Sequence, residues 1–254
     1  MGPRRPAPTR FTVGVVRFAR SARWIPRVEN EADDLRPVGL SARIRIVSVI
    51  QFDSVDAPLD RAGVAPAAAR ALGRAEAMGL LHANGPIRHL DLKLLTRLLR
   101  EVVHSSGVGR DAVAAISTAS PSPERISTAL RRLFDELEQS PVPEHEWRSL
   151  LGTLGLELLT QLVGVSVASA RRYAGGERTT PDEVADRLHF LALVVADLAG
   201  SYNEFGIRRW FARSRPQLDG RSPSQLLRGN WRADQPGPQR VRELARALTG
   251  PLAT

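Results

Sequence analysis

Two adjacent arginines, Arg171 and Arg172, follow Ser166 and precede a Gly-Gly pair in the stretch VGVSVASARRYAGGERTTP, residues 163–181. The planar fork of an arginine side chain matches the O6 and N7 atoms of guanine, or two phosphate oxygens. A helix that enters the DNA major groove needs short polar residues near its start and arginines further along. The stretch therefore predicts DNA contact by Ser166, Ser169, Arg171, Arg172, Tyr173 and Arg178.

Catalytic and metal-binding patterns have less support. EHEWRS, residues 144–149, begins like a zinc-protease helix, but Ser149 stands where the second histidine would be. GVGRDA, residues 107–112, matches a loose dinucleotide pattern but follows a helical segment, so it predicts a turn that opens the next helix. The histidines follow no metal-ligand spacing and are expected at the surface or as satisfied interior residues; they are His82, His89, His104, His145 and His189. We expect no catalytic residue, metal or cofactor, since no motif supports an enzyme in the N-terminal half.

The elements that would position the arginines are three short helices, predicted over residues 147–155, 156–163 and 167–174. Gly164 can end the second helix in the left-handed conformation, and Ser166 can cap the third. Val167 and Ala170 are predicted to face inward. Ser169, Arg172 and Tyr173 are predicted to face outward, with Arg171 on a flank. This is the layout of a helix-turn-helix, although a helical hairpin with a solvated basic face fits the same pattern.

The residues after this stretch predict a small helical region. A long helix begins near Pro181, with Thr180 as its cap, and its core stripe comprises Val184, Leu188, Leu191, Val195 and Leu198. Phe205, Trp210 and Phe211 lie on the next helix, Ser222-Pro223 opens another, and a last helix is predicted over 239–250. Such aromatic and leucine faces are more typical of a core than of a groove for a partner.

The stretch from residue 147 to residue 250, about 40% of the chain, resembles a known family. LTQLVGVSVASARRYAGGERTTP is similar to the Cro/repressor-like (Xre) helix-turn-helix, with Thr160 in place of the common alanine. The segment C-terminal to it resembles the toxin-binding domain of the Xre/MbcA/ParS antitoxin family. The matching residues are Phe205, Trp210, Leu218, Gly220, Ser222, Pro223, Leu226, Leu227, Gly229, Val241, Leu244 and Gly250. WRADQPGPQ, residues 231–239, lengthens the usual link before the last helix.

The resemblance implies a dimeric, cytoplasmic, DNA-binding antitoxin. Such a protein represses its own promoter and masks a neighbouring toxin, often an NAD-degrading enzyme of the RES type. The resemblance implies that residues 210–248 bind the toxin. The candidate partner-binding residues in this region are Trp210, Phe211, Leu226, Leu227, Val241, Leu244 and Leu248. The alternative function is a protein–protein interaction or scaffold protein, in which the helix-turn-helix is a packing unit.

The rest of the chain is basic and harder to interpret. The 254 residues include 36 basic and 27 acidic side chains, and residues 1–27 hold seven arginines and no acid. This arm suits nucleic acid but equally suits a disordered solubilising tail. Strands are predicted at 12–16 and 43–52, and helices at 65–81, 90–104 and 123–138.

These patterns predict a mainly α protein with an N-terminal α or α+β unit. The predicted divisions are a basic arm (1–27), an N-terminal domain of unknown role (28–143), a helix-turn-helix region (144–200) and a toxin-binding region (201–254). The chain has no cysteine and no apolar run long enough to span a membrane, so we expect a cytoplasmic protein.

Overall fold

The computed structural model describes residues 50–81 and 86–248, which all belong to one compact unit. Within these residues the chain forms eleven α-helices, one short 3-10 helix and two strands, so the prediction of a mainly α fold is confirmed. The basic arm (1–27), the strand predicted at 12–16 and most of the strand predicted at 43–52 lie outside the described residues.

The first half begins with two parallel strands joined through a helix. β1 (Ile50–Val55) pairs with β2 (Ile87–Leu90), and α1 (Val64–Ala77) lies between them in the chain. Three helices follow; they are α2 (Leu92–Ser106), α3 (Arg110–Ile116) and α4 (Pro123–Gln139). α2 and α4 agree with the helices predicted at 90–104 and 123–138. In the 107–112 stretch, residues 107–109 form a turn and residues 110–112 begin α3, so the prediction of a turn that opens the next helix is confirmed.

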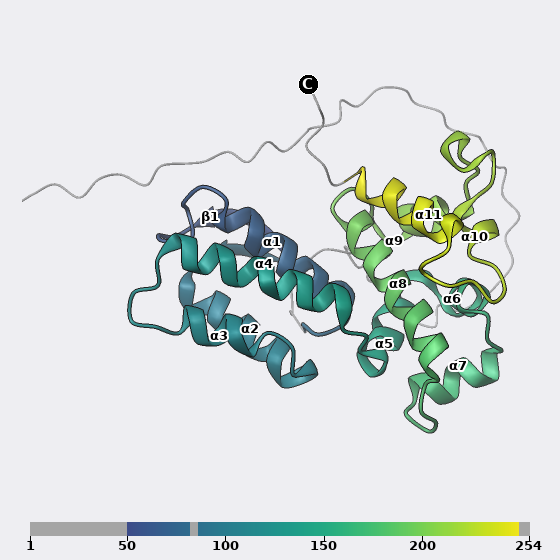
Figure 1. The fold of residues 1–254 in the computed structure, drawn as a ribbon, viewed down its shortest axis with the longest axis horizontal. Helices are drawn as coiled ribbons and strands as arrows, with labels where there is room; N and C mark the ends of the chain where they lie inside the picture. Colours follow the sequence, from purple (N-terminus) through teal and green to yellow (C-terminus); the bar gives the residue numbers. More distant parts are fainter. Residues whose placement is uncertain (1–49, 82–85, 249–254) are drawn as a thin grey trace, which may run out of the picture. The chain divides into compact units, whose positions relative to one another are not determined.

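The core of this half lies between α1 and α4, which run side by side in Figure 1. The buried face of α1 is rich in small side chains, including Ala68, Ala71 and Ala75. Small residues at a helix contact allow the two axes to approach closely. The apolar stripe of α4 fills the facing surface, and its buried members include Ile126, Leu130, Leu133 and Leu137.

The second half is built around α8 (Asp182–Ala199). The other elements are α5 (Pro143–Leu154), α6 (Leu156–Val163), α7 (Val167–Ala174), α9 (Glu204–Ala212), the 3-10 helix (Pro216–Leu218), α10 (Pro223–Leu226) and α11 (Pro236–Arg246). α8 contacts α1, α5, α6, α9 and α11, and its side chains are buried almost all round, which is typical of a helix in the middle of a core. The predicted stripe on α8 is confirmed as buried. None of the described helices is both long enough and apolar enough to cross a membrane.

The prediction that Thr180 caps α8 is wrong. Pro181 is the residue before α8 and makes no side-chain cap. The Thr180 hydroxyl instead accepts a hydrogen bond from Nε1 of Trp147, at 3.0 Å. The Trp147 side chain is fully buried, and its N–H needs an acceptor inside the protein.

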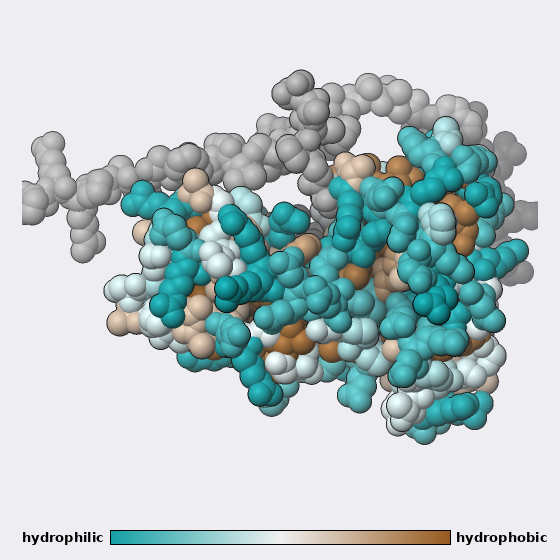
Figure 2. All heavy atoms as spheres, viewed as in Figure 1, coloured by the Kyte–Doolittle hydropathy of each residue, from teal (hydrophilic) through white to brown (hydrophobic). Residues whose placement is uncertain are grey.

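Four of the seven candidate partner-binding residues are in the core, which corrects their prediction as a contact surface. Trp210, Phe211, Leu227 and Val241 are at most 1% exposed, because α9, α10 and α11 pack together and close over α8. Burying a large apolar side chain stabilises the fold by about 1.5–3 kcal/mol, which explains why these residues face inward. Leu226 and Leu244 are half-buried, and Leu248 is exposed. Figure 2 shows that hydrophilic residues cover most of the visible face, with hydrophobic residues in small patches.

Candidate nucleic-acid interface

The α6–α7 pair is two short helices joined by the three-residue turn Gly164-Val165-Ser166. Gly164 ends α6 with a φ of 77°, a left-handed conformation that favours glycine. Ser166 caps α7, and its Oγ accepts a hydrogen bond from the backbone N–H of Ser169 at 3.1 Å. The helix bounds, the glycine and the cap are as the sequence predicted.

α7 is fixed to the protein through Ala170 and Tyr173. Ala170 is fully buried, and the Tyr173 ring stacks on the indole of Trp147 in α5, with 5.9 Å between ring centroids. The predicted outward position of Tyr173 is therefore wrong, as is the predicted inward position of Val167, which is 40% exposed. The flat indole of Trp147 sets the rotation of α7 about its axis, and this tertiary contact leaves no mark on the periodicity of α7 itself.

The opposite face of α7 is exposed and basic. It carries Val167, Ala168, Arg171 and Arg172, and exposed Arg178 follows in the loop before α8. Nε of Arg172 donates to the Ala168 carbonyl at 3.4 Å, and the Arg178 guanidinium lies 5.8 Å from the centre of the Tyr173 ring. In the described part of the chain, no carboxylate forms an ion pair with any of the three arginines.

The two predicted serines lie at the start of the same helix. Ser166 is exposed and Ser169 is half-buried. The Ser166 hydroxyl donates to Oγ of Ser169 at 3.0 Å while accepting the cap hydrogen bond from the Ser169 N–H. The structure thus brings Ser166, Arg171, Arg172 and Arg178 to the exposed side of the α6–α7 pair, with Ser169 at its edge and Tyr173 beneath it.

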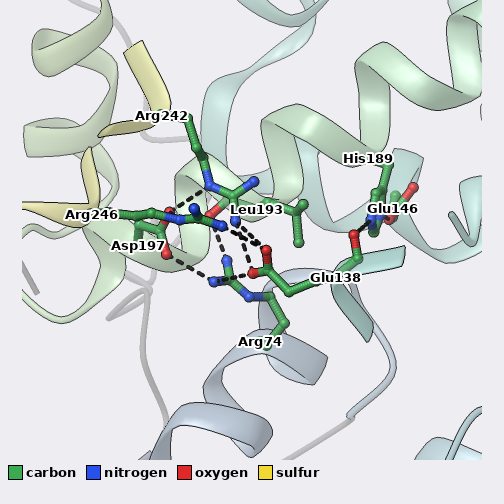
Figure 3. A network of polar contacts seen from close by, with 8 residues as sticks. All are labelled: Arg74, Glu138, Glu146, His189, Leu193, Asp197, Arg242 and Arg246. Carbon is green, nitrogen blue, oxygen red and sulfur yellow. Dashed lines mark hydrogen bonds and ion pairs between the residues drawn. The ribbon is translucent and has the colours of Figure 1, made fainter. Parts of the chain in front are cut away.

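A buried ionic network lies elsewhere in the molecule, where α1, α4, α8 and α11 meet (Figure 3). Arg74 of α1 contacts Glu138 of α4 at 2.6 Å and Asp197 of α8 at 2.9 Å. Arg242 of α11 contacts Asp197 at 2.7 Å and Glu138 at 2.8 Å. Arg246 adds a 2.8 Å contact to Glu138 from the exposed end of α11. The network therefore links all four helices through two carboxylates.

Burial and charge act in opposite directions on this network. Desolvation by itself would raise the pKa of Glu138, but the guanidinium groups around it outweigh that effect and hold the pKa below its ordinary value. Desolvation lowers the pKa of Arg74, against the attraction of Asp197 and Glu138. The acidic and basic side chains pair with one another, and Nη1 of Arg74 also donates to the Leu193 carbonyl at 2.6 Å, although the buried Nε of Arg74 has no hydrogen-bond partner among the described residues. This is the arrangement of a structural link between helices.

His189 and Glu146 form a second buried pair beside the network (Figure 3). Nδ1 of His189 lies 2.6 Å from Oε1 of Glu146, and Nε2 lies 3.1 Å from the Glu138 carbonyl oxygen. A carbonyl only accepts, so Nε2 carries a hydrogen and one further proton is shared between Nδ1 and Oε1. Burial raises the pKa of Glu146, opposed by its hydrogen bond from His189. Of the two positions that the sequence left open for each histidine, surface or satisfied interior, His189 takes the interior one, and its hydrogen bonds join the end of α4 to the start of α5.

A cavity of about 970 Å³ opens beside these two groups, between α8, α11 and the residues before α11. Its lining includes His189, Phe190, Trp231, Arg242 and Arg246. Both acidic and basic side chains line it. The cavity therefore favours no single charge of ligand.

Sequence reasoning missed the ionic network. Arg74, Glu138, Asp197 and Arg242 are far apart in the chain, and each resembles an ordinary surface charge in its own segment. The one available signal is Asp197, the single charged residue in the otherwise apolar C-terminal half of α8, residues 190–199. A charge among apolar neighbours indicates a buried partner without identifying it.

Comparisons with known proteins found no matching family model, no similar curated protein and no similar solved structure. The resemblance to the antitoxin family thus depends only on the sequence motifs between residues 147 and 250.

Proposed function

We propose that the protein is a sequence-specific DNA-binding regulator in which α7 enters the major groove. The observation that carries this proposal is the outer face of α7, where Arg171 and Arg172 are exposed and have no carboxylate partner in the described chain. A solvated surface helix usually mixes both signs of charge, with acidic and basic residues three or four positions apart. α7 carries no acidic residue at all.

The α6–α7 pair is also held in a defined geometry, as recognition requires. The buried Tyr173–Trp147 stack fixes the rotation of α7, and the Ser166 cap fixes where α7 begins. Side chains presented from a fixed helix lose less conformational freedom on binding than side chains on a mobile loop. This anchoring supports an interface for a duplex over a helix that merely fills the surface.

The exposed side chains suit different parts of a DNA duplex. Arg171 and Arg172 can bind guanine edges or phosphates through both arms of their guanidinium groups. Val167 and Ala168, at the start of α7, offer apolar contact to a thymine methyl group. Arg178 is placed after the helix, and we assign it to a phosphate. Tyr173 has no base-reading role in this proposal, since its ring is covered by Trp147.

Homodimerisation, repression of its own promoter and neutralisation of a toxin are further parts of the proposal, and they rest on the family resemblance. A dimer would place two copies of α7 about 34 Å apart, one turn of the duplex. Of the seven candidate partner-binding residues, a toxin could use those that are still accessible, namely Leu226, Leu244 and Leu248.

The test of DNA binding combines duplex selection with a double substitution. The full chain is first used to enrich binding sites from duplexes with a randomised centre, and affinity for the enriched duplex is measured by fluorescence anisotropy. Arg171→Ala plus Arg172→Ala is expected to weaken binding by about 2–6 kcal/mol, at about 1–3 kcal/mol for each arginine. Helix content, measured by circular dichroism, is expected to stay unchanged because both side chains are exposed.

A matched control removes the same charge elsewhere. Arg131 and Arg132 are adjacent, exposed arginines on α4, and changing both to alanine is expected to leave affinity for the duplex nearly intact. Equal binding by wild type and the Arg171/Arg172 variant would reject the proposal. A scaffold protein would show a different salt response, because affinity for DNA falls steeply with salt while an apolar protein contact changes little.

A further inference from the structure

The residues between α10 and α11 form a loop that is tied to the turn before α7. The part of it that makes the contacts described below, residues 228–232, is called the 228–232 loop. Trp231 anchors it, since its ring is buried and its Nε1–H donates to the backbone carbonyl of Leu162 at 2.8 Å. The same ring meets Phe190 of α8 edge to face, with 5.0 Å between centroids. The loop is therefore fixed to the end of α6 and to α8.

Arg187 and Gly164 hold the other end of the loop. The buried Arg187 side chain reaches from α8 to the Gly229 carbonyl at 3.4 Å and to Oδ1 of Asn230 at 3.5 Å. That carbonyl also lies against the turn, where a Cβ on Gly164 would stand 3.1 Å from the Gly229 oxygen. The loop and the Gly164-Val165-Ser166 turn are thus in direct backbone contact.

Arg228 is the unpaired cation of this loop. It is exposed, and no carboxylate in the described chain contacts it. Arg232 differs, because Asp234 binds its guanidinium at 3.2 and 3.1 Å. Arg228 directly precedes Gly229, whose carbonyl contacts the turn at the entrance to α7, so its backbone is one residue away from that turn.

From this placement we infer that the 228–232 loop is a second DNA-contacting element and that Arg228 binds a backbone phosphate flanking the groove that α7 enters. The inference rests on the proposed function. Contacts to phosphates carry little sequence information, but they fix the register and orientation of a protein on the duplex. Because the loop is joined to the turn by Trp231, Gly229 and Arg187, a phosphate held by Arg228 would orient α7 directly.

The inference is tested with the full chain on the enriched duplex and on one unrelated duplex, at a series of salt concentrations. Arg228→Ala is expected to weaken binding to both duplexes by the same factor. It should also lower the slope of log affinity against log salt by about 1, the change for one lost phosphate contact. Arg228→Lys keeps the charge and should retain the slope. Arg97→Ala, which removes an exposed arginine from α2, should change neither quantity.

Two results would overturn the inference, and only the second of them would also reject the proposed function. If wild type binds and depends on Arg171 and Arg172, but Arg228→Ala keeps both the affinity and the slope, the loop is not a contact element and the proposed function stands. If wild type binds no duplex at low salt, both the proposed function and the role of the loop are rejected.

Discussion

Glu138 shows how single residues connect the two halves of the chain. Its carboxylate contacts the guanidinium groups of Arg74, Arg242 and Arg246. Two of these arginines are themselves buried, so they depend on carboxylates inside the protein for their hydrogen bonds. Removing one partner from such a cluster leaves charge that water does not reach, and this is costly.

We therefore expect Glu138→Gln to destabilise the fold by about 3–5 kcal/mol, the usual cost of breaking a buried ion pair from one side. Glutamine keeps the shape of the side chain and one acceptor oxygen but loses the charge. The free energy of unfolding is measured by urea titration at pH 7. Asp234→Asn is the control and should change stability little, because the Arg232–Asp234 pair is exposed. Equal stability of wild type and Glu138→Gln would contradict the structural role of the network.

The difference in the free energy of unfolding between wild type and Glu138→Gln should depend on pH with a definite sign. Although desolvation opposes it, the surrounding arginines hold the pKa of Glu138 below its ordinary value in the folded state. The stabilisation from its charge is thus complete above the ordinary glutamate pKa and is lost as the pH falls through the lower, folded-state value. The gap between wild type and Glu138→Gln should narrow on acidification. The raised pKa of Glu146 has the opposite effect on the pH dependence of stability. Since Glu146 is present in both proteins, its contribution cancels from the difference between their free energies of unfolding.

The α6–α7 pair is the element on which the proposed function depends, and Gly164 is its most constrained position. Its φ of 77° disfavours any residue with a Cβ. Its neighbour in space is the Gly229 carbonyl, which Arg187 holds in place. Gly164 therefore serves both the conformation of the turn and the contact with the 228–232 loop.

Gly164→Ala is expected to cost more than the ordinary left-handed penalty of about 1–2 kcal/mol. The added Cβ would stand 3.1 Å from the Gly229 oxygen, so the 228–232 loop must shift. Urea titration measures the loss of stability, and tryptophan fluorescence reports the surroundings of Trp231.

Gly176→Ala provides the matched comparison, since Gly176 has a φ of 74° and no atom within 4 Å of an added Cβ. The loss of stability in Gly176→Ala therefore comes from the left-handed backbone conformation alone. The difference between the two variants then measures the contact between turn and loop, and equal costs would show that the contact is unimportant.

At the scale of the molecule, α8 and the ionic network join segments that the sequence places in separate regions. The boundary predicted between residues 143 and 144 falls at the start of α5, inside the compact unit to which the described residues belong. α1 and α4 from before it share carboxylates with α8 and α11 from after it (Figure 3).

We expect the described helices to unfold in one transition. Trp147, Trp210 and Trp231 all lie after residue 143, so tryptophan fluorescence reports the second half, while far-UV circular dichroism reports helices from both. The experiment uses Trp24→Phe, which removes the remaining tryptophan. Coincident urea curves from the two probes are expected because the halves share a buried network. Two separated curves would contradict this and support independent domains.

The sequence by itself determined the local structure of this protein. Helix bounds around α6 and α7 followed from apolar spacing, from Ser166 as a cap and from Gly164 as a terminator. These signals act between residues a few positions apart, so one segment contains all the information. The outward position predicted for Arg172 is confirmed, while Arg171, predicted on a flank, is exposed as well.

Only the tertiary structure decided the rotation of α7, the burial of Trp210 and Phe211, and the partners of Arg74 and Asp197. Each depends on a surface supplied by a distant segment, such as the Trp147 indole beneath Tyr173 or α11 over α8. An apolar or charged side chain has the same local pattern whether it contacts solvent, a partner or its own chain. Which of these it meets is determined by the packing of the whole molecule, where burial and charge pairing are settled together.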